Sequence, residues 1–156
     1  SGGAAIAVWA CEFLRGRGGV TTLMLLGPAL SPTYDLRRAL RSLQRCYAMV
    51  SRRDRWMLGL GTRIFGTMDR RFCSAAGRVG FRPPTALSSE DRSAYDRLRE
   101  IHWTPLLERD GHHGGHTGWA RVSFLRRHLL PILHGEPILL TGALDGPADG
   151  DRQNNR

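Results

Sequence analysis

The regular spacing of apolar residues between positions 36 and 50 constrains the fold of this chain more than any other feature. These residues recur at steps of 4, 3, 4 and 3 and are Leu36, Leu40, Leu43, Tyr47 and Val50. Such steps place side chains on one face of an α-helix. Residues 33–58 are therefore predicted to contain an amphipathic helix that starts at Ser31-Pro32 and ends before Gly59.

Arginines occupy the other faces of this predicted helix. They are Arg37, Arg38, Arg41, Arg45, Arg52 and Arg53. A row of guanidinium groups opposite an apolar stripe suits contact with the phosphates of a nucleic acid, with an anionic phospholipid or with an acidic protein surface. We predict that these six residues contact a partner or a phosphate.

Two further segments are predicted to be helical. Residues 88–103 begin with Ser88 as a helix cap and Asp91 three positions later, and residues 117–134 carry a second apolar stripe that Pro131 interrupts. No segment shows sustained alternation of apolar and polar residues, the pattern typical of a half-buried strand. The predicted fold is all-α, with two to four short amphipathic helices, extended arms rich in Gly, Pro and Arg, and no large independent core.

The chain is predicted to consist of five segments. These are an apolar N-terminal segment (1–32), the basic amphipathic helix (33–58), an arginine-rich arm or linker (59–87), a helical region (88–140) and a disordered tail (141–156). Residues 18–34 include an uncharged stretch near the lower limit for a membrane span, but glycines and prolines interrupt it. A buried or interfacial segment is the favoured interpretation, with a membrane span as the alternative.

The charge is concentrated in the first half of the chain. All 23 basic residues are arginine, and the chain carries a formal net charge of +9. Residues 1–84 hold 14 arginines against 4 acidic residues, whereas residues 85–156 hold 9 arginines against 10 acidic residues. This asymmetry indicates that the first half contacts something anionic. A GC-rich gene read in a wrong frame would also be rich in Arg, Gly, Ala and Pro, although the regular apolar stripes argue against that.

The sequence shows no recognisable catalytic constellation. The motifs GxSxG, HExxH, GxGxxG and the P-loop are all absent. His112, His113 and His116 are weak candidates for metal ligands, but four glycines between residues 110 and 118 oppose a rigid site. We therefore predict no catalytic residues, no metal and no cofactor.

These features together favour a non-catalytic accessory subunit of a large assembly, bound to other protein subunits and in contact with anionic phospholipid. The segment Arg70–Ala76 resembles the cleavage region of a mitochondrial presequence, with arginines, an aromatic residue and small residues in order. A mitochondrial complex of the respiratory or ATP-synthase type is the first expectation. An RNA-contacting protein of an organellar ribosome is the alternative, and no small-molecule substrate is expected.

Overall fold

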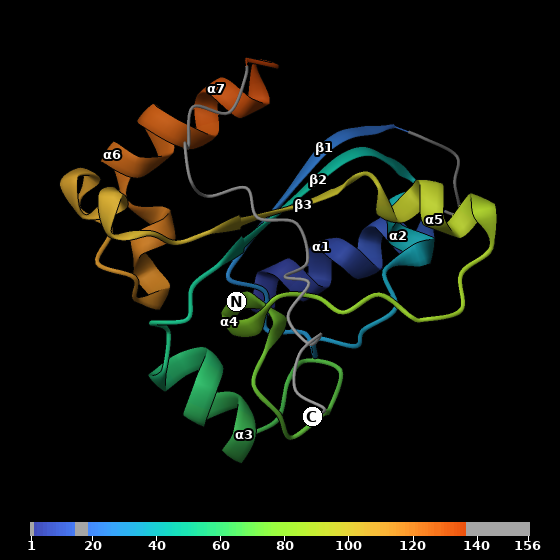
Figure 1. Cartoon of the computed structure of the whole chain (residues 1–156), viewed down its shortest axis with the longest axis horizontal. Helices are drawn as coiled ribbons and strands as arrows, with labels where there is room; N and C mark the ends of the chain where they lie inside the picture. The colour runs from blue at the N-terminus through green and yellow to red at the C-terminus, as the bar shows by residue number, and fades with distance from the viewer. Residues whose placement is uncertain (1, 15–18, 137–156) are drawn as a thin grey trace, which may run out of the picture.

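Three parallel strands form the centre of the fold (Figure 1). Residues 2–14 and 19–136 are described by the computed structural model of the chain. In them β1 (Val20–Leu26), β2 (Leu43–Val50) and β3 (Leu98–His102) lie in the order β1-β2-β3. Leu25 pairs with Ala48, and Ala48 pairs with Glu100. Because both pairings are parallel, the carboxyl ends of the three strands lie at one edge of the sheet, hereafter the carboxyl edge.

Three helices cover the first face of the sheet: α1 (Gly2–Phe13), α2 (Arg37–Arg41) and α5 (Ser89–Tyr95). Their apolar side chains pack against alternate residues of the strands. Val8 of α1 and Leu40 of α2 share one buried cluster with Leu25, Cys46 and Ala48. Burial of this apolar surface is the main driving force that holds the helices to the sheet.

The second face is covered by the chain that follows β3. It forms η2 (Pro105–Asp110), η3 (His116–Ala120), α6 (Val122–Phe124), η4 (Leu125–Leu129) and α7 (Leu130–Leu133). Trp119 and Phe124 pack here against Tyr47, Met49 and Ile101 in a second buried cluster. The sheet is therefore buried on both faces, between two layers of helices.

The chain between β2 and β3 lies at and beyond the carboxyl edge. It forms η1 (Trp56–Gly61), α3 (Thr62–Ile64) and α4 (Ala76–Val79) before it reaches α5. Gly77 of α4 makes two backbone hydrogen bonds at the carboxyl edge. Its amide donates to the Pro28 carbonyl at 2.8 Å, and its carbonyl accepts from the Ser51 amide at 2.9 Å. These bonds tie the turn after β1 to the turn after β2.

The predicted all-α fold is wrong, because the structure mixes seven α-helices with a three-stranded parallel sheet in the described part of the chain. The long amphipathic helix predicted within residues 33–58 does not form. Arg37–Arg41 is a single helical turn, and Leu43–Val50 is the central strand of the sheet. The predicted helix 88–103 likewise ends at Tyr95 and gives way to β3.

The burial of the central strand explains this error. A strand covered on both faces is apolar at nearly every position rather than at alternate ones. The five residues Cys46–Val50 are all apolar and all buried, so their pattern contains helical steps by coincidence. An amphipathic helix would instead require polar residues among these five.

One local prediction is confirmed. The Ser88 side chain caps α5 by accepting a hydrogen bond from the Asp91 amide at 3.1 Å. Residues 20–26, in the segment weighed as a membrane span, form β1, and none of the described helices has the length and apolarity needed to cross a bilayer. The predicted disordered tail, 141–156, lies outside the described residues.

Candidate functional site

The predicted arginine row is not a continuous surface. Arg37, Arg38 and Arg41 gather at one end of the sheet, whereas Arg52 and Arg53 follow β2 at the opposite, carboxyl edge. Arg45 is half-buried within β2 itself. The structure therefore brings together only three of the six arginines that were predicted to contact a partner.

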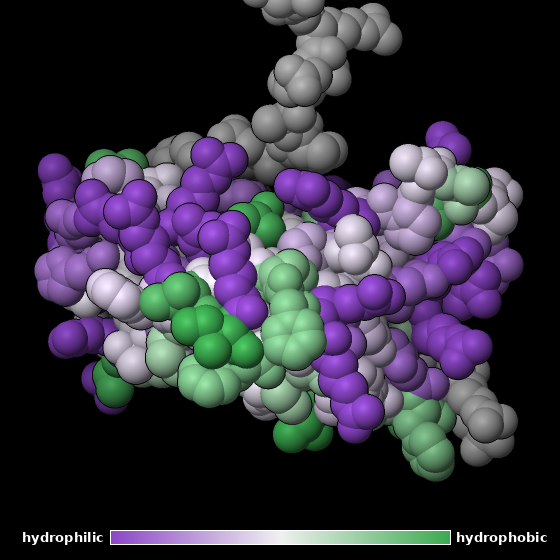
Figure 2. All heavy atoms as spheres, turned by 90° about the horizontal axis from the view of Figure 1, so that it is seen from below, coloured by the Kyte–Doolittle hydropathy of each residue, from purple (hydrophilic) through white to green (hydrophobic). Residues whose placement is uncertain are grey.

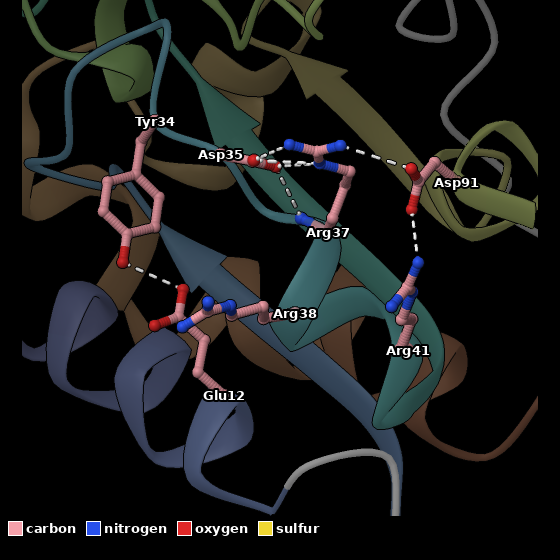
Figure 3. A pocket seen from close by; sticks show the side chains of 7 residues that line it. All are labelled: Glu12, Tyr34, Asp35, Arg37, Arg38, Arg41 and Asp91. Atoms are coloured by element: carbon pink, nitrogen blue, oxygen red, sulfur yellow. Dashed lines mark hydrogen bonds and ion pairs between the residues drawn. The ribbon is translucent and has the colours of Figure 1, made fainter. Parts of the chain in front are cut away.

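These three arginines line a cavity of about 430 Å³ with Glu12, Tyr34, Asp35 and Asp91 (Figure 3). Arg37 bonds to Asp35 at 2.5 Å and to Asp91 at 3.2 Å, and Arg41 bonds to Asp91 at 2.7 Å. Burial by itself would raise the pKa of Asp91, but hydrogen bonds from Ser88, Arg37 and Arg41 lower it. Internal carboxylates thus neutralise two of the three guanidinium groups.

Arg53 is also engaged within the molecule. Its Nη1 atom bonds to Glu108 at 2.7 Å, and its guanidinium lies 4.4 Å from the centre of the Trp103 ring. This pair of contacts anchors the loop after β2 to the chain after β3.

The three candidate histidines do not converge on a common centre. His112 is buried, His113 is exposed, and His116 is half-buried beside a carboxylate. Within residues 2–14 and 19–136, no cluster of three or more potential ligands is arranged to hold a metal ion.

A short polar contact at the carboxyl edge joins Asp54 to His116. The Oδ2 atom of Asp54 lies 2.7 Å from Nδ1 of His116. Asp54 follows β2 and its side chain is 3% exposed, while His116 follows β3 and its side chain is 18% exposed. The Leu58 amide donates to Oδ1 of Asp54 at 3.3 Å, so both oxygens of this buried carboxylate have partners.

The environment of His116 orients its ring. A Cβ atom on Gly27, in the turn after β1, would lie 3.4 Å from Cε1 and Nδ1 of His116. In the neutral imidazole, a hydrogen bond from Nδ1 to the carboxylate places the proton on Nδ1 and leaves the lone pair on Nε2. An imidazole held in this tautomer can act as a general base.

The loop that carries His116 is held by its own hydrogen bonds. Nε1 of Trp103 donates to the His112 carbonyl at 2.8 Å, and Oγ of Ser51 donates to the Gly114 carbonyl at 2.6 Å. The Gly114 amide donates to Nδ1 of His112 at 3.0 Å. Gly118 is required here because a Cβ atom would overlap the His112 ring. The glycines that indicated a flexible loop in the sequence thus permit close packing.

His112 should make the stability of the protein depend on pH. Burial lowers the pKa of His112 from 6.5 to about 4. Between these two pH values His112 is protonated in the unfolded chain but neutral in the folded chain. The free energy of unfolding is therefore expected to fall by roughly 3 kcal/mol as the pH drops from the unfolded to the folded pKa. Urea unfolding across this range measures the effect.

The matched variant for this prediction is His112→Asn, whose side-chain oxygen can still accept from the Gly114 amide but does not titrate. It should lose the part of the pH dependence between pH 6.5 and about 4 that comes from His112. An equal pH dependence in both proteins would contradict the assignment.

The N-terminal end of α1 lies at the same edge. A Cβ atom on Gly2 would lie 3.4 Å from the sulfur of Met68. The Met68 amide donates to the carbonyl of Ala29 at 2.8 Å, two residues after Gly27. Figure 1 shows α1 beginning beside α4. The positive end of this helix dipole is therefore placed at the edge that carries Asp54 and His116.

Two other histidines pair with carboxylates. His128 lies 2.7 Å from Asp110, which also bonds to Arg127 at 2.7 Å, and His102 lies 3.2 Å from Glu100. The hydrogen bond from His128 is the main cause that lowers the pKa of Asp110. Arg127 already neutralises Asp110, so this pair is less suited than Asp54–His116 to stabilise a charged imidazole.

Sequence reasoning missed Asp54 and assigned His116 only a weak metal role. The two residues are 62 positions apart, and only the parallel pairing of β2 and β3 brings their loops together. The sequence carried a signal for only one of them, since Asp54 closely follows the apolar run 46–50. Neither a known protein family, nor a curated protein sequence, nor a solved structure matches the chain.

Proposed function

We propose that this protein is a serine hydrolase that cleaves carboxylic esters, with Ser1 as nucleophile, His116 as general base and Asp54 as the carboxylate that orients His116. The observation that carries the proposal is the 2.7 Å contact between buried Asp54 and His116 at the carboxyl edge. In open sheets of parallel strands, this edge is where ligands bind. The accessory-subunit and RNA-binding hypotheses stay predictions, as does the mitochondrial location.

Ser1 lies outside the residues that the structure describes, and it is proposed as nucleophile because of its position in the sequence. It directly precedes Gly2 and α1, whose N-terminal end lies at the carboxyl edge. The order Ser1, Asp54, His116 matches, by analogy, the chain order of Ser, Asp and His in hydrolases built on parallel sheets, and Ser1-Gly2-Gly3 before a helix supplies only the Ser-x-Gly half of their G-x-S-x-G motif. Two other hydroxyls near this edge are already engaged, since Ser31 donates to Asp69 and Ser51 donates to the Gly114 carbonyl.

The proposed reaction proceeds in two steps. The Ser1 oxygen forms a bond to the acyl carbon of the ester while its proton passes to Nε2 of His116, and the alcohol leaves with that proton. Water then attacks the acyl group, gives a proton to His116 and releases the carboxylic acid and Ser1. Asp54 stabilises the imidazolium that forms in each step, and backbone N–H groups at the start of α1 are suited to stabilise the oxyanion.

Covalent labelling tests the proposal directly. A fluorophosphonate probe should modify Ser1 in the purified protein, as peptide mass spectrometry would show, and hydrolysis of p-nitrophenyl butyrate should stop in parallel. The variant His116→Ala should lower both rates by at least about 10³-fold, because the serine loses its base.

The matched control is His113→Ala, which removes an exposed histidine from the same loop. It should leave labelling and ester hydrolysis unchanged. The proposal fails if the native protein does not react with the probe, if the label lies on a residue other than Ser1, or if the His113 variant loses as much activity as the His116 variant.

A further inference from the structure

Exposed apolar side chains gather on the segment that follows Asp54. Phe65 is 86% exposed, Trp56 is 78% exposed and Phe72 is 74% exposed. With their neighbours they form what is hereafter the η1–α3 patch: Trp56, Met57, Leu60, Ile64, Phe65 and Phe72. Figure 2 shows apolar residues bordered by hydrophilic ones on the side of the molecule where α3 lies. Contiguous exposed apolar surface of this kind marks an interaction site.

A cationic cavity opens beside this patch. It has a volume of about 400 Å³, and Arg55, Arg63 and Arg78 line it with Trp56 and Leu60. These arginines are the only charged residues in its lining. The Nε atom of Arg78 is buried and has no hydrogen-bond partner within the described residues. Three guanidinium groups around one cavity are suited to bind a phosphate.

We infer that the η1–α3 patch and its arginine cavity dock onto a membrane surface that contains anionic phospholipid. A lipid phosphate would enter the cavity, while Trp56 and Phe65 would insert at the boundary between headgroups and acyl chains. A free phosphate would fill the cavity but leave the patch in water. A bilayer presents phosphates and apolar chains side by side, so it accounts for both features.

Docking in this way would bring the carboxyl edge close to the bilayer. Arg55 directly follows Asp54 in the chain, and a Cβ atom on Gly59 of η1 would lie 3.4 Å from Arg78 and 3.6 Å from the carbonyl of Asp54. The surface therefore begins next to Asp54 in the chain. The inference does not rest on the proposed hydrolase activity, because membrane binding is measured without turnover.

Vesicle flotation tests the inference with the full chain. Vesicles of phosphatidylcholine alone are compared with vesicles of phosphatidylcholine mixed with phosphatidylglycerol. The protein should float with the anionic vesicles and stay behind with the neutral ones. Added salt should weaken binding, since surface attraction falls off within a Debye length. Inorganic phosphate serves as a separate competitor for the cavity.

Variants separate the two parts of the surface. Arg63→Ser should weaken binding to the anionic vesicles about fivefold, the effect of one cation near such a surface. Phe65→Ser should weaken it about tenfold, because an inserted aromatic ring returns to water. The controls are Arg92→Ser on α5 and Phe13→Ser at the end of α1, both exposed and distant from α3. Circular dichroism verifies that every variant is folded.

Selective flotation that both patch variants weaken, and that both controls retain, supports the inference. Equal flotation with neutral vesicles, or patch variants that bind as well as the native protein, would overturn it. Binding of inorganic phosphate without any vesicle binding would also overturn it, in favour of a soluble phosphate ligand. Retention of vesicle binding in an inactive His116→Ala variant would show that docking and hydrolysis are separate properties.

Discussion

The variant Asp54→Asn is expected to lower kcat for ester hydrolysis by about 10⁴-fold without unfolding the protein. In the native protein the carboxylate accepts a hydrogen bond from Nδ1 of His116 at 2.7 Å. An asparagine amide in the same place would donate to Nδ1, so the ring would carry its proton on Nε2 and could not act as a base. The remaining side-chain oxygen can still accept from the Leu58 amide. Steady-state kinetics together with thermal unfolding measure the two effects separately.

The structure provides a matched control for this variant. Asp110 also lies 2.7 Å from a histidine, His128, but this pair lies in the layer that follows β3. Asp110→Asn should therefore change kcat little. Equal losses of activity in the two variants would mean that a shared loss of stability, rather than the tautomer of His116, explains the first result.

The variant Gly77→Ala is expected to destabilise the protein by about 3 kcal/mol or more. A Cβ atom at this position would lie 2.5 Å from the carbonyl carbon of Gly27 and 2.6 Å from the nitrogen of Pro28. Both atoms belong to the backbone, which cannot move away as the end of a flexible side chain can. The change in the midpoint of urea unfolding measures this cost.

Gly3→Ala is the control for the Gly77 variant. Gly3 also lies in a helix, and a Cβ atom there would meet nothing within 4 Å. Alanine should preserve or slightly raise stability at this position, since it favours helical backbone more than glycine does. If the two variants had the same midpoint, the close packing of α4 against the turn after β1 would not be what makes Gly77 necessary.

The Gly77 contact also links stability to the proposed active site. The turn that the new Cβ atom would displace contains Gly27, which packs against the ring of His116. A folded Gly77→Ala protein should therefore hydrolyse esters more slowly than native protein. The glycine acts on the reaction through the position of its neighbours, because it does not itself contact His116.

Features that depend on a few neighbouring residues could be read from the sequence. Ser88 and Asp91 specify the start of α5, because a serine side chain and an amide three residues later are within reach of each other in any helix. The apolar run 46–50 is buried, as its composition requires. The excess of arginine in the first half likewise follows from composition alone.

Tertiary structure decided whether the apolar run 46–50 became helix or strand. A buried run has the same composition in either form, and only a parallel neighbour on each side makes the strand favourable. Tertiary structure also decided the partners of the predicted arginines. Arg37 and Arg41 of α2 bond to Asp91, which lies in α5 more than 45 residues further along the chain.

The candidate active site was determined almost wholly by the tertiary structure. No local rule connects Asp54 with His116, because the two residues are 62 positions apart in the sequence. Their contact arises because β2 and β3 are parallel and end at the same edge, where the segments that follow them meet. The sequence by itself determined that a carboxylate and an imidazole were present. Their distance, tautomer and burial depend on the packing of α4, Gly27 and His112 around them, because hydrogen bonds and close contacts act only over a few ångströms in space, whatever the separation along the chain.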